Sequence, residues 1–451
     1  DKKEELSEAA TAAAAAAEAV EAILSGVSEA CCVKWEPLPD TPTMYADPDT
    51  IYGELEPQPG LRLVPPVRLL RSEWVVARAA QLRAVPADRR RALTLPRRQE
   101  LEVLEPSAYY SAEEVKALPR GPRNAGFPMA VLAVSHSWES EEHPDPHGRT
   151  LLMLADAITT AQAIQVSKGP YTWQTLPSRV AVFFDFCSLF QPPRAKEEPP
   201  IGEGPTMALR AALTRMQVWY AHQLTTCFFV TDGNTETAND GSHTPYHERG
   251  WPTFEYHVSA IGKAITSSGW PQLVDVGLGV DTLFERGVPL TPAALEHLLE
   301  SKRFTDGTDH GLVLSLYKKT VQCMIIGASR LIYSSCEWGP DEVRAFAAAW
   351  FSLCDRLEHF SLATNPIGPS GVAAFCENIG PGTLPRLKFL NFFNNQVGDD
   401  GLRCIAELLR RTPPHLPMLK TIRITGKNDT TPDGKHALEE ACRSRGIKIE
   451  G

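Results

Sequence analysis

The chain has 451 residues, 43% of them hydrophobic, so it is long enough for roughly three domains with buried cores. Its 45 basic and 55 acidic residues give a formal net charge of -10, which argues against nucleic-acid binding by the whole protein. Ten cysteines without a CxxC pair exclude a disulfide scaffold and favour reduced, buried thiols in the cytoplasm. The sequence has no run of about 18 apolar residues, so no membrane span is predicted. The acidic N-terminus lacks the basic region of a signal peptide.

The N-terminal quarter divides into two parts by composition. Residues 1–30 are rich in Ala and Glu and predict a helix, whereas residues 31–124 are first Pro-rich and then Arg-rich and predict an irregular region. The arginine clusters at 89–91 and 97–98 invite a nucleic-acid interpretation, but few aromatic residues accompany them and acidic residues are interspersed. Solvated helices with salt bridges are favoured, and no nucleic-acid partner is predicted.

Residues 125–280 predict an α/β domain. Apolar runs at 130–134, 180–184 and 227–230 have the length and composition of buried strands, and helical stripes of apolar residues separate them. A fourth strand is expected near 273–276. Strands that alternate with helices predict βαβ units, and hence a parallel sheet flanked by helices.

Polar residues follow these runs where each strand ends. In open α/β sheets, ligands bind beyond the carboxyl ends of the strands, so these residues are candidates for ligand binding. With two residues that open a later helix, the candidates are Ser135, His136, Trp138, Asp185, Cys187, Ser188, Asp232, Arg249 and Trp251.

Four short motifs in this region occur in a recognisable order. They are Ser135 and Trp138, then Asp185, Cys187 and Gln191, then Met216 and Tyr220, then Arg249, Trp251 and Glu255. Together they resemble the heterokaryon-incompatibility (HET) domain, over roughly residues 128–262. That family has Ser-x-x-Trp, Asp-x-x-Cys-x-x-Gln, Met-x-x-x-Tyr and Arg-x-Trp-x-x-x-Glu in the same order, and Cys187 stands one position earlier than this spacing.

HET domains are similar to Toll/interleukin-1-receptor (TIR) domains, so the resemblance implies a flavodoxin/TIR-like sheet. In enzymatic TIR domains the matching glutamate supports NAD cleavage, which gives Glu255 the catalytic role and makes NAD a substrate; no cofactor is expected. The alternative is an interaction domain in which Glu255 is structural. An enzyme should place Ser135, Asp185, Asp232 and Glu255 around one open pocket, whereas an interaction domain should have them hydrogen-bonded to each other.

The sequence favours two other site chemistries less. His136, His143 and His147, with Asp145, invite a zinc interpretation, but they lie in a Pro-rich loop and no metal site is predicted. Cys187 and His136 invite a nucleophile–base pair, but a buried strand cysteine is usually inert. The nucleotide-binding and zinc-protease motifs G-x-x-x-x-G-K-[ST], G-x-G-x-x-G and H-E-x-x-H are missing.

Residues 281–328 predict a helical connector, and residues 329–451 contain a repeat. Similar segments begin at Leu357, Leu387 and Leu419, 30 and 32 residues apart, with a degenerate copy near 331–343. They resemble leucine-rich repeats of the strand-plus-helix type, as in ribonuclease inhibitor. The sequence therefore predicts a signalling or interaction protein that binds a protein partner through the repeats and whose α/β domain self-associates or docks onto another protein.

Overall fold

A computed structural model describes residues 44–450 apart from short gaps at 59, 61–63, 87–88, 91–92, 120–128, 141, 165, 169–170, 174, 194–197, 232–243, 264–271 and 281–285. The predicted helix at 1–30 and the candidate Asp232 lie outside the described residues. The described residues form two compact units. The first, the α/β unit, comprises 44–280 with 299–320, and the second, the repeat unit, comprises 286–298 with 321–450.

The α/β unit is built on a five-stranded sheet of order β1-β5-β2-β6-β7. Its strands are β1 (Leu70–Arg71), β2 (Val131–His136), β5 (Ala181–Phe183), β6 (Thr226–Val230) and β7 (Leu273–Asp275). The last four pair in parallel, and β1 pairs antiparallel to β5 at the edge. Every residue of β2, β5 and β6 is buried, which explains why these strands are continuous apolar runs. The predicted parallel sheet flanked by helices is confirmed.

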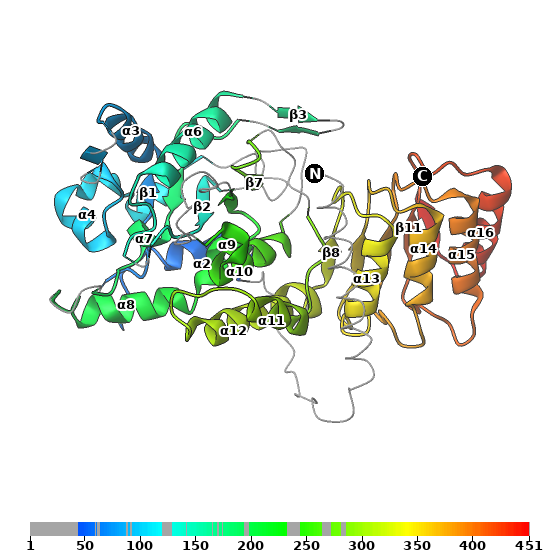
Figure 1. The fold of residues 1–451 in the computed structure, drawn as a ribbon. Helices are drawn as coiled ribbons and strands as arrows, with labels where there is room; N and C mark the ends of the chain where they lie inside the picture. Colours follow the sequence, from blue (N-terminus) through cyan, green and yellow to red (C-terminus); the bar gives the residue numbers. More distant parts are fainter. Residues whose placement is uncertain are drawn as a thin grey trace. The chain divides into compact units, whose positions relative to one another are not determined.

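Different helices cover the two faces of this sheet (Figure 1). The helices include α2 (Pro48–Gly53), α3 (Ser72–Arg83), α4 (Arg98–Leu104), α5 (Ala112–Lys116), α6 (Arg149–Ala163), α7 (Asp185–Ser188), α8 (Glu203–Leu213), α9 (Met216–Ala221) and α10 (Gly250–Ala260). Leu132 and Val134 of β2 share one core with α3 and α6. Because side chains alternate along a strand, Ser135 points to the opposite face, where α10 packs against β2.

The described part of residues 31–124 differs from the irregular region that its composition predicts. It contributes β1, α3, α4 and α5 to the α/β unit, and its side chains Leu82, Leu101 and Tyr109 are buried in the same core as the sheet. These apolar residues are widely spaced among arginines, so their pattern is weak in the sequence. A two-stranded sheet of β3 (Val166–Lys168) and β4 (Tyr171–Trp173) follows α6.

The predicted helical connector is helical over 292–300 and 309–326, whereas its described residues at 286–291 and 301–308 are not helical. It contains α11 (Pro292–Glu300), α12 (Asp309–Val321) and the short π-helix η5 (Gln322–Ile326). Thr291 begins α11 as expected, because its hydroxyl accepts a hydrogen bond from the Ala294 N–H at 3.1 Å. No helix among the described residues is long and apolar enough to cross a membrane.

The repeat unit alternates short parallel strands with helices, which lie side by side in Figure 1. In chain order they are β8 (Arg330–Ile332), α13 (Pro340–Trp350), β9 (His359–Ser361), α14 (Gly368–Glu377), β10 (Phe389–Asn391), α15 (Gly398–Arg410), β11 (Thr421–Arg423), α16 (Pro432–Ser444) and β12 (Lys448–Glu450). The strands form one sheet in sequence order. The middle residue of a strand, such as Phe360 or Leu390, is buried, while its neighbours are more exposed.

Buried asparagines connect successive repeats. Asn365 accepts hydrogen bonds from the N–H groups of Cys336 and Trp338 in the preceding repeat and donates to the Tyr333 and Leu362 carbonyls at 2.7 Å and to a third carbonyl at 3.5 Å. Asn395 accepts from the Asn365 N–H, and Asn428 accepts from the Asn395 N–H. Each turn therefore has its backbone groups satisfied by the next repeat, which explains the recurrence of asparagine at this position.

Candidate functional site

The first group of candidate residues lies on the α10 face of the sheet. The Ser135 hydroxyl donates to Glu255 Oε2 at 2.6 Å and lies 2.6 Å from the Tyr246 hydroxyl. The Tyr220 hydroxyl donates to the Val134 carbonyl at 3.2 Å and lies close enough to Glu255 to lower the pKa of that carboxyl. Ser135 is fully buried and Glu255 is only 6% exposed. The structure thus brings together the motif serine, the motif tyrosine and the motif glutamate in one buried polar network.

Burial controls the protonation of Glu255. Desolvation raises the pKa of this carboxyl to about 7, and the nearby negative charge of Asp185 adds to the increase, while Ser135 and His136 oppose it. When ionised, Glu255 accepts a hydrogen bond from the Ser135 hydroxyl; when protonated, it can donate one to Ser135. A carboxyl that titrates near neutrality suits acid–base chemistry, but a substrate must also reach it. Whether Glu255 is catalytic stays a prediction.

A second group lies at the ends of β2 and β5. His136 Nε2 is 2.9 Å from Asp185 Oδ1, and the Trp138 indole donates to Asp185 Oδ2 at 3.1 Å. His136 Nδ1 faces the Ser137 carbonyl at 3.3 Å, so both ring nitrogens face acceptors, as suits an imidazolium. Burial opposes this charge, but Asp185 outweighs burial and raises the pKa of His136. Burial alone would raise the pKa of Asp185, but the interaction with His136 outweighs burial and lowers this pKa.

Cys187 and Ser188 belong to the short helix α7 and have structural contacts. The Cys187 thiol donates to the Pro96 carbonyl at 3.2 Å, and the Ser188 hydroxyl accepts from the Phe184 N–H at 3.0 Å. Burial raises the pKa of the Cys187 thiol well above its usual value, and the partner of His136 is Asp185. This geometry does not join Cys187 and His136 as a nucleophile–base pair.

The residues that open α10 face outward from the buried network. Arg249 Nη2 donates to the Trp138 carbonyl at 2.5 Å, which ties the start of α10 to the end of β2. The Trp251 indole donates to Asp309 Oδ2 at 2.8 Å and so contacts α12 instead of a ligand site. Among the described residues, no group of three His, Cys, Asp or Glu side chains is arranged to hold a metal ion. His143, one of the loop histidines, instead approaches the Leu95 carbonyl at 2.9 Å.

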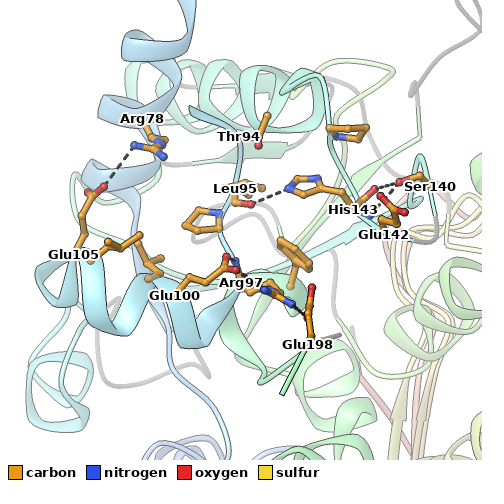
Figure 2. A pocket seen from close by; sticks show the side chains of 15 residues that line it. Arg78, Thr94, Leu95, Arg97, Glu100, Glu105, Ser140, Glu142, His143 and Glu198 are labelled. Carbon is orange, nitrogen blue, oxygen red and sulfur yellow. Dashed lines mark hydrogen bonds and ion pairs between the residues drawn. The ribbon is translucent and has the colours of Figure 1, made fainter. Parts of the chain in front are cut away.

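A cavity of about 590 Å³ lies beside this edge of the sheet (Figure 2). Phe186, which follows Asp185, forms part of its wall and contacts the rings of Trp138 and His143. The lining comes from α3, α4, α7 and three loops, namely Arg78, Thr94, Leu95, Pro96, Arg97, Glu100, Leu101, Leu104, Glu105, Ser140, Glu142, His143, Pro146, Phe186 and Glu198. Ser135, Asp185 and Glu255 do not line it.

Two groups of ion pairs link charged residues that line this cavity. Arg97 contacts both Glu100 and Glu198 at 2.6 Å, and Arg78 lies 3.4 Å from Glu105. Burial opposes the charge of Arg97, but the two glutamates outweigh burial and raise its pKa. In the sequence, interspersed arginine and glutamate indicate a solvated helix, so these residues were missed. Their one signal is the proline at 96, which follows the buried Leu95 and lies two residues before α4 begins.

Comparison with known proteins identifies one part of the chain. Residues 384–406, which span β10 and most of α15, match the family model described as Leucine Rich repeat. No HET or TIR domain is detected, and none of the curated proteins compared with the chain matches it. The chain is therefore an α/β protein with leucine-rich repeats near its C-terminus, and the HET and TIR resemblance stays an interpretation of the motifs.

Proposed function

We propose that this is a protein-interaction protein of a signalling type, and that the repeat unit binds an acidic segment of a partner protein. The observation that carries the proposal is the charge of the outward face of the β8–β12 sheet. This sheet face comprises the first and third residue of each strand: Arg330, Ile332, His359, Ser361, Phe389, Asn391, Thr421, Arg423, Lys448 and Glu450. Repeat arrays expose such extended surfaces for binding.

The sheet face is cationic although the whole chain is acidic. Arg330, Arg423 and Lys448 are exposed, and the one carboxylate on the face, Glu450, lies 3.4 Å from Lys448. Arg423 also lies over the Phe393 ring, 4.9 Å from its centroid, which holds the guanidinium in place. Exposed Ile332 and half-buried Phe389 add apolar surface. Basic groups around apolar anchors favour an acidic partner that carries apolar side chains.

For the α/β unit, we propose a HET/TIR-like domain that associates with other proteins or with itself. The order of its parallel strands along the sheet is second, first, third and fourth in sequence, which is the order of a flavodoxin-like sheet without its fifth strand. The mutual hydrogen bond of Ser135 and Glu255 is the arrangement expected of an interaction domain. NAD cleavage remains the alternative, and nicotinamide release by the purified chain would be its direct test.

A charge reversal on the sheet face tests the proposal. We expect the full chain to bind a fluorescent 12-residue peptide rich in Glu and Leu, measured by fluorescence anisotropy, and to bind the same peptide with Gln for Glu at least tenfold more weakly. The double variant Arg330→Glu with Arg423→Glu should weaken binding at least tenfold, because both attractive charges become repulsive. Arg443→Glu on α16, an exposed arginine away from the face, should leave binding unchanged. Equal effects of the two changes would refute the proposal.

A further inference from the structure

We propose that the sheet face binds a segment of its own chain, residues 17–30, which lies outside the described residues. The proposal rests on the proposed function, because it assigns a ligand to the same cationic surface. The segment would compete with the acidic partner, so that the chain limits its own partner binding. Three features carry the inference: the charge of the sheet face, its apolar centre and the composition of the segment.

The sheet face keeps a surplus of positive charge. Among the described residues, neither Arg330 nor Arg423 forms an ion pair, whereas Lys448 lies 3.4 Å from Glu450. Arg330 belongs to β8 and Arg423 to β11, and these strands are three strand spacings, about 14 Å, apart. Two guanidinium groups so far apart favour a ligand with several carboxylates spread along its length.

Apolar surface lies between these two charges. The strands between β8 and β11 are β9 and β10, and they place His359 beside Phe389, with ring centroids 5.6 Å apart. Ile332 of β8 is 43% exposed on the same face. A ligand that matches this face therefore carries apolar side chains between its carboxylates.

Residues 17–30 have this composition. The segment contains Glu18, Glu21 and Glu29 and neither lysine nor arginine. The large apolar residues between its outer glutamates are Val20, Ile23, Leu24 and Val27. Its 14 residues can cross the five strands of the sheet, a distance of about 19 Å, because they would measure about 21 Å as a helix and more as an extended chain.

A covalent link makes even a weak contact of this kind effective. Residues 31–43 join the segment to Met44, the first described residue, and these 13 residues span at most about 45 Å. Where such a linker can span the distance, it gives a ligand an effective concentration on the order of 1 mM. A segment with a dissociation constant of about 100 µM would then occupy the face about nine-tenths of the time and weaken partner binding about tenfold.

Competition in the full chain is the first test. The triple variant Glu18→Gln, Glu21→Gln and Glu29→Gln removes the charge of the segment. We expect it to bind the fluorescent peptide rich in Glu and Leu at least fivefold more tightly than the wild type does, measured by fluorescence anisotropy. A matched control changes the net charge by the same amount and should alter binding less than twofold. It replaces three exposed carboxylates of the α/β unit: Glu113→Gln, Asp156→Asn and Glu248→Gln.

The second test locates the segment. A synthetic peptide of residues 17–30 should bind the triple variant, and adding Arg330→Glu with Arg423→Glu to that variant should weaken this binding at least tenfold. In the wild type, a carbodiimide should link a glutamate of the segment to Lys448 or to Lys420, an exposed lysine beside the face. In an equal mixture of isotope-labelled and unlabelled protein, each linked pair found by mass spectrometry should carry one label only. Pairs of mixed label would assign the segment to a second copy and overturn the proposal.

The outcomes separate this proposal from the proposed function. Equal affinity of the wild type and the triple variant for the fluorescent peptide, or an equal gain in the control, would overturn the proposal and leave the face as a site for a partner alone. No binding of that peptide to the triple variant would refute the proposed function and this proposal together. Unchanged binding of the segment peptide after the charge reversal would place its site elsewhere and overturn the proposal. Equal melting temperatures of the variants would exclude unfolding as the cause.

Discussion

The two units of this protein satisfy their buried polar groups in different ways. In the repeat unit, one residue type does so at regular intervals, since Asn365, Asn395 and Asn428 each bind the backbone of the preceding repeat. In the α/β unit, several buried polar groups instead have single partners far away in the sequence, as Ser135 has in Glu255. A polar contact that recurs in every repeat is visible in the sequence as a period, whereas a single contact between two distant residues is not. The units should also differ in how they respond to mutation and to pH.

The largest effect is expected from the asparagine of the first complete turn. Asn365→Ala removes the partner of two N–H groups and of the Tyr333 and Leu362 carbonyls, all within a buried turn. Because each unsatisfied buried group costs about 1–3 kcal/mol and water can relieve part of this, we expect a loss of about 4 kcal/mol in the free energy of unfolding of the repeat unit. Hydrogen exchange read by mass spectrometry would assign the loss to peptides of the repeat unit.

The matched control is Asn378→Ala, which removes a single hydrogen bond to the Ala374 carbonyl at the end of α14. We expect a loss of about 1 kcal/mol or less there. If Asn365→Ala were no more costly than Asn378→Ala, or if it exposed the sheet of the α/β unit equally, the asparagine ladder would not be the main polar support of the repeats.

The next effect depends on pH and distinguishes the α/β unit. Glu255 has its pKa raised to about 7 in the folded chain, above the ordinary value of 4.5. The folded state therefore holds this proton more tightly, so the stabilisation is present below about pH 4.5 and is lost as the pH rises through about 7. Relative to Glu255→Gln, the wild type should lose roughly 3 kcal/mol of unfolding free energy between pH 4.5 and 7.5. Urea unfolding of both proteins at several pH values measures this difference.

Glu248→Gln is the control for this experiment, because Glu248 is exposed and lies seven residues before Glu255. Its unfolding free energy should follow that of the wild type at every pH. A difference between wild type and Glu255→Gln that does not change with pH would mean that Glu255 titrates normally, and the buried network would then be more open to water than the structure shows.

The sequence predicted the parts of the fold that have local signals. The apolar runs at 130–134, 180–184 and 227–230 coincide with β2, β5 and β6, because a strand covered on both faces must be apolar throughout. The repeats were visible because their period recurs. By contrast, β1 has two residues and α3 carries its buried side chains among arginines, so the contribution of residues 44–119 to the core could not be predicted.

The candidate site was predicted only in part, because only some of its residues have local signals in the sequence. Rules for parallel sheets place Ser135, His136 and Asp185 at one edge, and the structure brings His136 and Asp185 into contact. Those rules do not say which side chains point outward. The alternation along β2 places Ser135 on the α10 face and His136 on the other. The cavity is formed by α3, α4, α7 and loops that no local pattern joins.

A smaller effect is expected at the pair that ends β2 and β5. Asp185→Asn leaves His136 without its carboxylate partner and weakens the contact with the Trp138 indole. A hydrogen bond to a charged group contributes about 1.5–3 kcal/mol, and the Asp185 side chain is 24% exposed, so we expect a loss of about 2 kcal/mol at pH 7. Since the pKa of Asp185 is lowered, this contribution should vanish as the pH falls through that lowered value.

The control for that pair is Asp156→Asn, which breaks a surface ion pair with Arg83 in the same unit. The Asp156 side chain is 67% exposed, and such pairs contribute at most about 1 kcal/mol. Equal losses for Asp185→Asn and Asp156→Asn in urea unfolding would show that the His136 pair is no stronger than a surface contact, and that the edge of the sheet is solvated.

The smallest effect is expected for the reactivity of buried cysteines, in which the two units should behave alike. The thiols of Cys187 in α7 and Cys376 in α14 are buried, and burial raises the pKa of Cys187 well above its usual value and that of Cys376 to about 12. Because the thiolate is the reactive form, both should resist iodoacetamide at pH 7.5 while the chain is folded, and react once urea unfolds it. Peptide mass spectrometry reads each site. Rapid labelling of Cys187 alone in the folded chain would show an accessible thiolate at the end of β5, and would restore the nucleophile interpretation that its contact with Pro96 argues against.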